Sequence, residues 1–139
     1  MREAVYQALF DLVSSAYPWA TASRQLAHWS DVPSEAQPAI FQAQQSEAVE
    51  GPHGAGRKWD LRVNLYVYVS RAPNGAPSAS GLNAALDALA SALGPVNGRP
   101  LNLGGLAQWC VINGTIEHFE GTLGDQSVAI VPVQIAVVW

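Results

Sequence analysis

Residues 51–58, Gly-Pro-His-Gly-Ala-Gly-Arg-Lys, have the glycines and the lysine of a phosphate-binding loop. That motif needs the lysine directly after its last glycine, then a serine or threonine, with a strand before it and a helix after it. Here Arg57 precedes Lys58, Trp59 follows, and strands are expected on both sides. The spacing therefore favours a hairpin tip over a nucleotide site.

The three histidines do not have the spacing of a metal site. His28, His53 and His118 lie in separate segments, whereas zinc ligands usually include a closely spaced pair. Glu117 and Glu120 lie near His118 and could supply a general base with an orienting carboxylate. A charged, alternating stretch is more typical of the solvent-facing side of a strand, so we predict no metal and no catalytic residue here.

Cys110 is the single cysteine, so the chain cannot form an internal disulfide. Its neighbours are Trp109 and Val111, and nothing close in sequence would lower the pKa of its thiol. We therefore expect a small buried hydrophobic side chain rather than a nucleophile. Together these residues predict that the chain is not an enzyme and holds no cofactor.

Composition limits the classes of protein that fit. The 139 residues have the length of one domain, predicted over 1–139. The net charge of −4 argues against a nucleic-acid grip. No stretch approaches the roughly 18 apolar residues of a membrane span, and no signal peptide is recognisable, so we expect folding in a cytoplasm. Only 13% of the residues are charged, about half the usual quarter, which suggests that some surface is interface.

Hydrophobic periodicity divides the first half into a helix, a weak strand and a hairpin. Apolar residues at helical spacing predict an amphipathic helix from Arg2 to about Ser15, ended by Pro18. The segment from Trp19 to Trp29 has no clear period and is at most a short strand. The other elements expected in this half are a strand over 39–49, a glycine-rich loop over 50–57 and a half-buried strand over 61–70.

The second half repeats the order of helix and hairpin. A helix is expected from Ser78 or Ser80 to the stop at Gly94-Pro95. A strand over 106–120, broken near Asn113-Gly114, then pairs with a strand over 126–138. These elements predict an α+β fold, with a five-stranded, mostly antiparallel or mixed sheet and both helices packed on one face.

The end of the chain is uncharged from residue 127 to residue 139. At strand spacing one row is entirely apolar, while Pro132 and Gln134 interrupt the opposite row. Proline cannot donate a ladder hydrogen bond, so the pattern suggests an edge strand or a bulge, with Pro132 and Gln134 on the edge. Just before it, Gly124 and Asp125 predict a structural turn, with a left-handed glycine and an aspartate bonded to backbone amides.

Five segments of the second half carry a resemblance that the elements alone do not. They are Leu82-Asn83-Ala84-Ala85-Leu86-Asp87-Ala88-Leu89, Leu103-Gly104-Gly105-Leu106, Gly114-Thr115-Ile116, Gly121-Thr122-Leu123-Gly124-Asp125-Gln126 and Ala129-Ile130-Val131-Pro132-Val133. In this order they resemble the tail terminator, or tail completion, proteins of long-tailed bacteriophages. The first half is similar in layout, with its N-terminal helix, the hairpin opening at 37–41 and the strand around 65–68.

The resemblance implies a structural protein of the virion, located at the tail-neck junction. Copies of the chain would close a ring, expected as a hexamer, on the head-proximal end of the tail tube and stop its growth. The implied partners are the chain itself, the tail tube protein and the head-tail connector protein, with no membrane, and DNA would pass through without specific binding. We expect the hairpin tip to supply contacts through Arg57, Lys58 and Trp59, and its loop to become ordered on assembly.

Other classes of function stay open at this point. Small head-to-tail connector and neck proteins share much of the same layout. A small ligand-binding or enzymatic α+β domain would need convergent polar groups in a cleft, which the sequence does not indicate. A non-viral oligomeric adaptor, including a component of a domesticated phage-like particle, is the third class.

Overall fold

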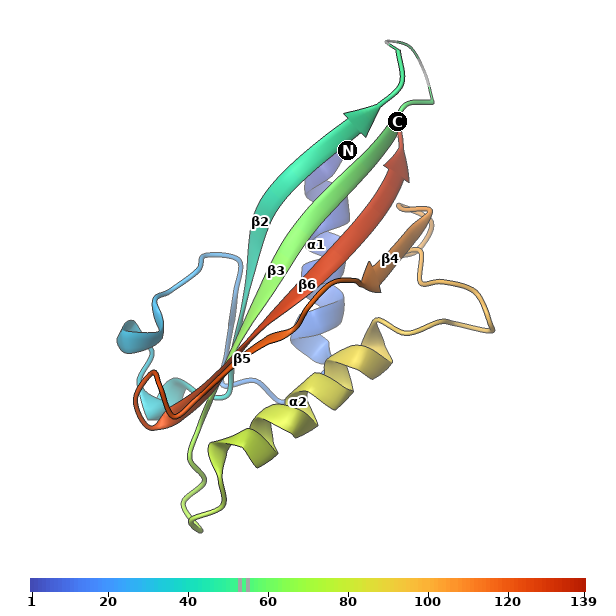
Figure 1. Ribbon diagram of the computed structural model, residues 1–139. Coiled ribbons are helices and arrows are strands. Elements are labelled where there is room, and N and C mark those ends of the chain that lie inside the picture. The colour runs from blue at the N-terminus through green and yellow to red at the C-terminus, as the bar shows by residue number, and fades with distance from the viewer. Residues whose placement is uncertain (53, 55) are drawn as a thin grey trace.

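The computed structural model describes residues 1–52, 54 and 56–139; His53 and Ala55 lie outside the described residues. The elements follow the predicted order (Figure 1). The helices are α1 (Arg2–Ser15) and α2 (Ser78–Ala92), with short 3-10 turns η1 (Trp29–Asp31) and η2 (Ser34–Ala36). The strands are β1 (Thr21–Ser23), β2 (Ala39–Glu50), β3 (Lys58–Ser70), β4 (Trp109–Ile112), β5 (Glu117–Glu120) and β6 (Gln126–Val138).

Within the described residues the strands form one six-stranded mixed sheet. Its order is β1-β2-β3-β6-β4, with β5 also paired to β6. The pairings are antiparallel except that of β1 with β2, which is parallel. The predicted α+β class is thereby confirmed. The sheet has one strand more than predicted, because the break near Asn113-Gly114 separates β4 from β5.

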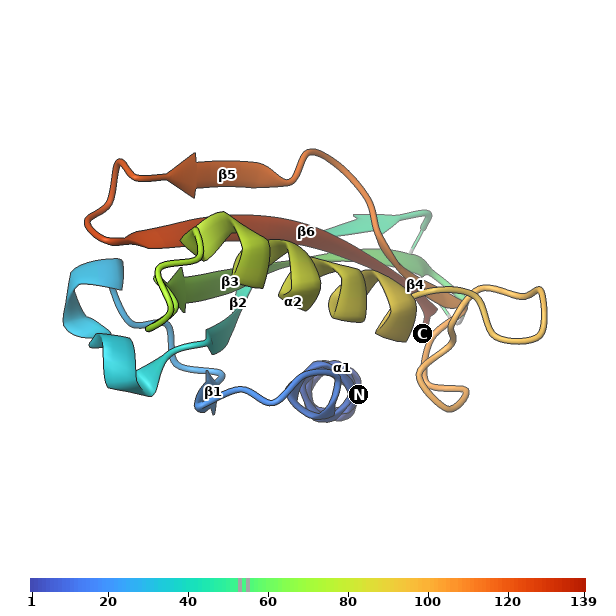
Figure 2. The same cartoon turned by 90° about the horizontal axis from the view of Figure 1, so that it is seen from below.

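Both helices pack on one face of the sheet, as predicted (Figure 2). Leu9 of α1 and Leu89 of α2 are fully buried there, together with Leu65 of β3 and Val133 of β6. Side chains alternate along a strand, so this side, named the helix face below, receives every second residue of each strand. The long strands therefore place their most apolar row beneath the helices.

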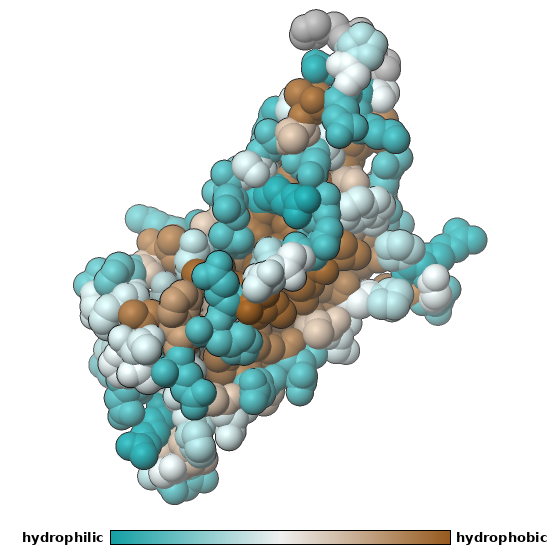
Figure 3. Space-filling view, viewed as in Figure 1, coloured by the Kyte–Doolittle hydropathy of each residue, from teal (hydrophilic) through white to brown (hydrophobic). Residues whose placement is uncertain are grey.

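The opposite side of the sheet, named the open face below, is covered at one end by residues 24–38. Val32 of that segment packs beside Tyr68 of β3 in a second buried cluster. The Tyr68 hydroxyl also donates to the Ala27 carbonyl at 2.8 Å, which ties the segment to the sheet. Beyond this cluster, outward side chains such as Ile130 are half-buried, and Figure 3 shows a hydrophobic band across this face.

The last strand is not the edge strand that Pro132 and Gln134 suggested. β6 lies between β3 on one side and β4 and β5 on the other. The Pro132 carbonyl accepts a hydrogen bond from the Asn113 backbone N–H at 3.1 Å. In an antiparallel strand the backbone N and O of one residue point to the same side. The proline nitrogen, which has no hydrogen to donate, therefore faces residues 113–116, where the strand beside β6 is interrupted between β4 and β5. The edge prediction was wrong because a break in the adjacent strand accommodates the proline.

The turn before β6 is held differently from the prediction. Gly124 has φ of +82°, the left-handed conformation expected of it. Asp125 makes no hydrogen bond to the turn among the described residues, so that part of the prediction was wrong. The Gln126 amide donates to the Leu123 carbonyl at 2.9 Å instead. The Gln126 side chain is buried beneath the turn and bonds it there, whereas the Asp125 side chain is exposed.

Candidate interaction surfaces

At the hairpin end of the sheet, tryptophan rings and guanidinium groups stack together, and both termini lie at this end (Figure 1). The ring centroids of Trp59 and Trp139 are 5.6 Å apart. The guanidinium carbon of Arg2 lies 4.8 Å from the Trp59 centroid and 5.6 Å from that of Trp139, and that of Arg57 lies 5.9 Å from Trp59. Exposed cation–aromatic contacts contribute about 0.5–1 kcal/mol each. This stack fastens the start of α1 to the sheet.

Glu47 of β2 also binds the Arg2 guanidinium. Arg2 Nε donates to Glu47 Oε2 at 2.8 Å and to Oε1 at 3.0 Å, and the Tyr6 hydroxyl donates to Oε1 at 3.0 Å. Burial, followed by the hydrogen bond to the Glu47 carboxylate, raises the pKa of Tyr6 well above its usual range. Tyr6 therefore stays a neutral donor, and the network joins α1 to β2.

The predicted contact residues Arg57, Lys58 and Trp59 divide between the fold and the surface. The Arg57 backbone exchanges hydrogen bonds of 2.9 and 3.0 Å with that of Trp139. Trp59 is half-buried in the stack, packed against the core of the helix face. Lys58 points to the open face and is exposed. Their contact with a neighbouring subunit stays a prediction, and Lys58 is the residue whose side chain is most available for it.

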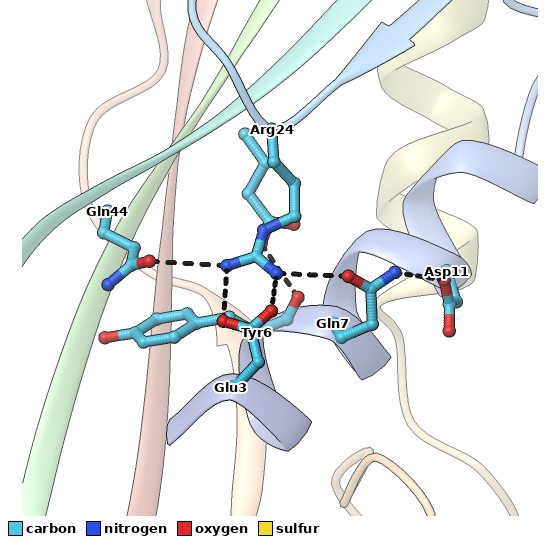
Figure 4. Close-up of polar contacts among 7 residues, drawn as sticks. Glu3, Tyr6, Gln7, Asp11, Arg24 and Gln44 are labelled. Atoms are coloured by element: carbon cyan, nitrogen blue, oxygen red, sulfur yellow. Dashed lines mark hydrogen bonds and ion pairs between the residues drawn. The ribbon is translucent and has the colours of Figure 1, made fainter. Parts of the chain in front are cut away.

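A second polar cluster fastens the chain after β1 to α1 (Figure 4). The Arg24 guanidinium forms an ion pair with Glu3 and donates to Gln7 Oε1 at 3.1 Å and to Gln44 Oε1 at 3.4 Å. Gln7 in turn donates to Asp11 at 2.8 Å. The polar groups of this cluster are directed at one another across α1 and β2. Its role is therefore to position the segment that covers the open face.

The histidines and the other candidate catalytic or metal-binding side chains do not form a common site in the described residues. His28 Nδ1 lies 2.7 Å from Ser30 Oγ in a local turn, and His118 is exposed on β5. His53 and Ala55, in the loop expected to order on assembly, lie outside the described residues. In the parts of the chain that the structure describes, no three His, Cys, Asp or Glu side chains could hold a metal ion together.

Cys110 is fully buried on the helix face, as expected of a small hydrophobic side chain. Burial raises the pKa of its thiol to about 12. The thiolate is the reactive form, so Cys110 is a poor nucleophile at neutral pH. In the folded protein it is a packing residue.

An apolar groove of about 380 Å³ lies on the open face, beside the segment that covers one end of it. Strands from distant parts of the sequence build its floor, and the covering segment and β5 contribute to its sides. The side chains that define it are Tyr66, Val128 and Ile130 on the sheet, with Leu26, Trp29 and Phe119 around them. A groove lined this way accepts an apolar side chain.

A more polar pocket adjoins the groove and shares Trp29 and Leu123 with it. The Gln37 amide donates to the Val32 carbonyl at 3.0 Å and to Gln126 Oε1 at 2.7 Å. Gln126 continues the chain of hydrogen bonds to the Leu123 carbonyl. These contacts join the 3-10 segment to the β5–β6 turn, so the side of the groove is held in place before any partner binds.

Sequence reasoning did not identify the groove, although one signal was present. Val128 and Ile130 make the outward row of β6 apolar as well, a pattern typical of a strand that is covered on both faces. Their neighbours depend on the register: Tyr66 pairs with Ile130, and Phe119 pairs with Val128. The apolar row was visible in the sequence, whereas the aromatic side chains that meet it were not.

No protein-family model matches this chain, and no curated protein matches it. Among solved structures, one matches over 99% of this chain and 92% of its own length, with a TM-score of 0.48 and 21% sequence identity. A likeness at that level carries no argument about function. No helix in the described residues is long and apolar enough to cross a bilayer.

Proposed function

We propose that this chain is a ring subunit of the tail terminator kind. It caps the head-proximal end of a bacteriophage tail tube, stops tube growth and offers a surface to the head-tail connector protein. The proposal joins the sequence resemblance to one structural observation, the apolar groove on the open face of the sheet. Contiguous apolar surface of this kind is typical of a protein interface.

The edge of the sheet supports an assembly role as well. β1 pairs with β2 only over residues 39–41, so in the described residues the outer side of β2 from Gln42 onward faces no other strand. Unpaired backbone groups along such an edge can pair with another chain. The hairpin end of the sheet is secured, because Trp139 is bonded to Arg57 and stacked on Trp59. The subunit is thus a firm scaffold with exposed surfaces.

The charge distribution suits a ring through which DNA passes. The chain has a net charge of −4. Arg2, Arg24 and Arg62 are engaged by Glu47, Glu3 and Asp60. Tight phosphate binding depends on clustered free Lys and Arg, which would also hinder the movement of DNA. A ring of weakly acidic subunits would therefore let DNA pass through without holding it.

A capping assay with purified components tests the proposal. Tubes grown from the cognate tail tube protein should lengthen without limit, and adding this chain should shorten them and place a ring at one end in electron micrographs. Binding to the connector alone, with tubes unaffected, would favour the neck-protein alternative. Tubes and connectors that both ignore the chain would refute the assignment to this part of the virion.

Ligand binding is a second candidate because of the groove. Its volume of about 380 Å³ is within the roughly 300–1,000 Å³ of small-molecule sites. A screen of apolar small molecules by thermal shift tests this candidate, and the second readout is the Trp29 fluorescence, taken as the difference between the wild type and Trp29→Phe because the chain has five tryptophans. A ligand that raises Tm and quenches Trp29 would support it, and the absence of any such ligand would count against it.

A further inference from the structure

The two segments that flank the apolar groove, named the rim below, carry carboxylates without basic partners, although the groove itself is lined by apolar and aromatic residues and His28. Residues 25–37 and 117–126, which contribute to the groove and the adjoining pocket, contain five acidic residues and no Lys or Arg. None of the five forms an ion pair within the part of the chain that the structure describes. This rim favours an occupant that brings an apolar side chain together with a positive charge. The five residues are Asp31, Glu35, Glu117, Glu120 and Asp125.

The loop between α2 and β4 presents such a pair of side chains on a rigid turn. Val96 and Arg99 form a β-bridge, with backbone hydrogen bonds of 2.8 and 3.1 Å. Asn97 and Gly98 between them have φ of 53° and 75°, as a type I′ turn requires. Val96 is 55% exposed, and Arg99 forms no ion pair among the described residues. Residues 94–108 contain no Asp or Glu that an acidic rim would repel.

The loop between α2 and β4, which carries this turn, and residues 24–38, which contribute to the groove, lie at opposite ends of the molecule in both Figure 1 and Figure 2. They cannot meet within one chain, but two copies can bring them together through a different patch on each copy. Heterologous contacts of this type close rings where the rotation between copies allows it. We propose that the 96–99 turn of one copy docks in the groove of a second copy. Val96 then lies against the aromatic side chains, and Arg99 faces Glu117.

The inference rests on the proposed function, because it assigns the contact between ring subunits. It commits to one occupant, a second copy, on charge complementarity: the rim has carboxylates without basic partners, among them Glu117 paired with Ile130 of the groove, and the turn has a guanidinium without an acidic partner. The turn is also preorganised by its two backbone hydrogen bonds, so docking would cost little ordering of the loop.

Cysteine cross-linking tests the contact directly. The variant Leu26→Cys with Val96→Cys places thiols at two positions that are 44% and 55% exposed, whereas Cys110 is buried and unreactive. A short bis-maleimide should link this variant into dimers and higher oligomers at concentrations where rings form. The matched control is Leu26→Cys with Val49→Cys, since Val49 is 39% exposed near the hairpin end. Cross-linked oligomers no more abundant than those of the control would overturn the inference.

A charge swap tests the polar half of the contact. Arg99→Glu should raise the concentration needed for half-assembly about tenfold, because repulsion at a charged rim weakens association. Arg71→Glu makes the same change in net charge at an exposed arginine outside the turn and should have little effect. Adding Glu117→Lys to Arg99→Glu should restore assembly. Equal effects of Arg99→Glu and Arg71→Glu, measured by sedimentation, would overturn the proposed pairing.

The outcomes separate this inference from the proposed function. Rings on tail tubes without 26–96 cross-links would refute the inference and leave the terminator role intact. Cross-linked rings that ignore both tubes and connectors would support the inference and refute that role. A wild-type chain that does not associate at its highest soluble concentration, together with a Leu26→Cys, Val96→Cys variant that does not cross-link on tubes, would overturn the inference.

Discussion

The two faces of the sheet differ in how they are closed, although alternate residues of the same strands build them. On the helix face, Leu65 and Val133 are 0% exposed beneath α1 and α2. On the open face, Tyr66 and Ile130 are half-buried, and the chain covers only the end beside residues 24–38. The helix face therefore stabilises the subunit, whereas the open face retains apolar surface that a partner can cover. Strand periodicity separates the two rows, but the covering elements decide what each row does.

Deleting residues 134–139 should have the largest effect, because it removes the last five of the 13 residues of the central strand β6. Loss of the buried Ile135 and Val137 costs roughly 1.5–3 kcal/mol each, against a total stability of about 5–15 kcal/mol. β3 and β4 would also lose backbone partners, and the Trp59 stack would lose Trp139. We expect insoluble or unfolded protein by circular dichroism. A soluble truncation with a native spectrum that fails only to cap tails would show that this segment is a docking arm.

Alanine substitution on the two faces gives a matched comparison. Leu65→Ala should destabilise the fold by about 2–5 kcal/mol, as expected for a fully buried leucine. Ile130→Ala on the open face should cost about 1 kcal/mol and should weaken assembly as well. Denaturant titration measures the first quantity and sedimentation the second. Equal losses of stability would mean that the open face is closed within the subunit.

Gly124→Val tests the turn that leads into β6. With φ of +82°, a β-branched residue at this position should cost about 1 kcal/mol or more. Asp125→Ala is the control and should change little, because Asp125 makes no hydrogen bond to the turn among the described residues. Thermal unfolding of both variants shows whether the conformation of Gly124 or the side chain of Asp125 stabilises the turn. A destabilised Asp125→Ala with an unaffected Gly124→Val would reverse the assignment.

The smallest effect on stability is expected at Lys58. This side chain is exposed on the open face, so Lys58→Ala should change the free energy of unfolding by less than about 0.5 kcal/mol while reducing the fraction of capped tails. Arg57→Ala should lower Tm more, because Arg57 stacks on Trp59. If Lys58→Ala unfolds the protein, Lys58 belongs to the fold and not to a contact surface.

Local patterns predicted the elements well because each depends on neighbours in the sequence. Alternation predicted the strand over 61–70 within β3, and turn residues placed the final strand at 126–138. Pro132 led to a wrong edge assignment, because the gap that accommodates it lies in another strand. The hairpin tip was recognisable as a candidate contact region. The burial of Trp59 was not recognisable from the sequence, because its partner Trp139 is 80 residues further along the chain.

The sequence by itself determined the weakly charged composition, the order of helices and hairpins, and the two alternating rows of each long strand. The packing of both helices on one face also followed from the order of the elements, whereas only the tertiary structure decided that residues 24–38 cover one end of the other face and that an apolar groove lies beside them. The reason is physical: the groove exists where the register of β3, β5 and β6 brings Tyr66, Phe119 and Ile130 together. That register results from packing the whole helix face at once, so no single segment encodes it.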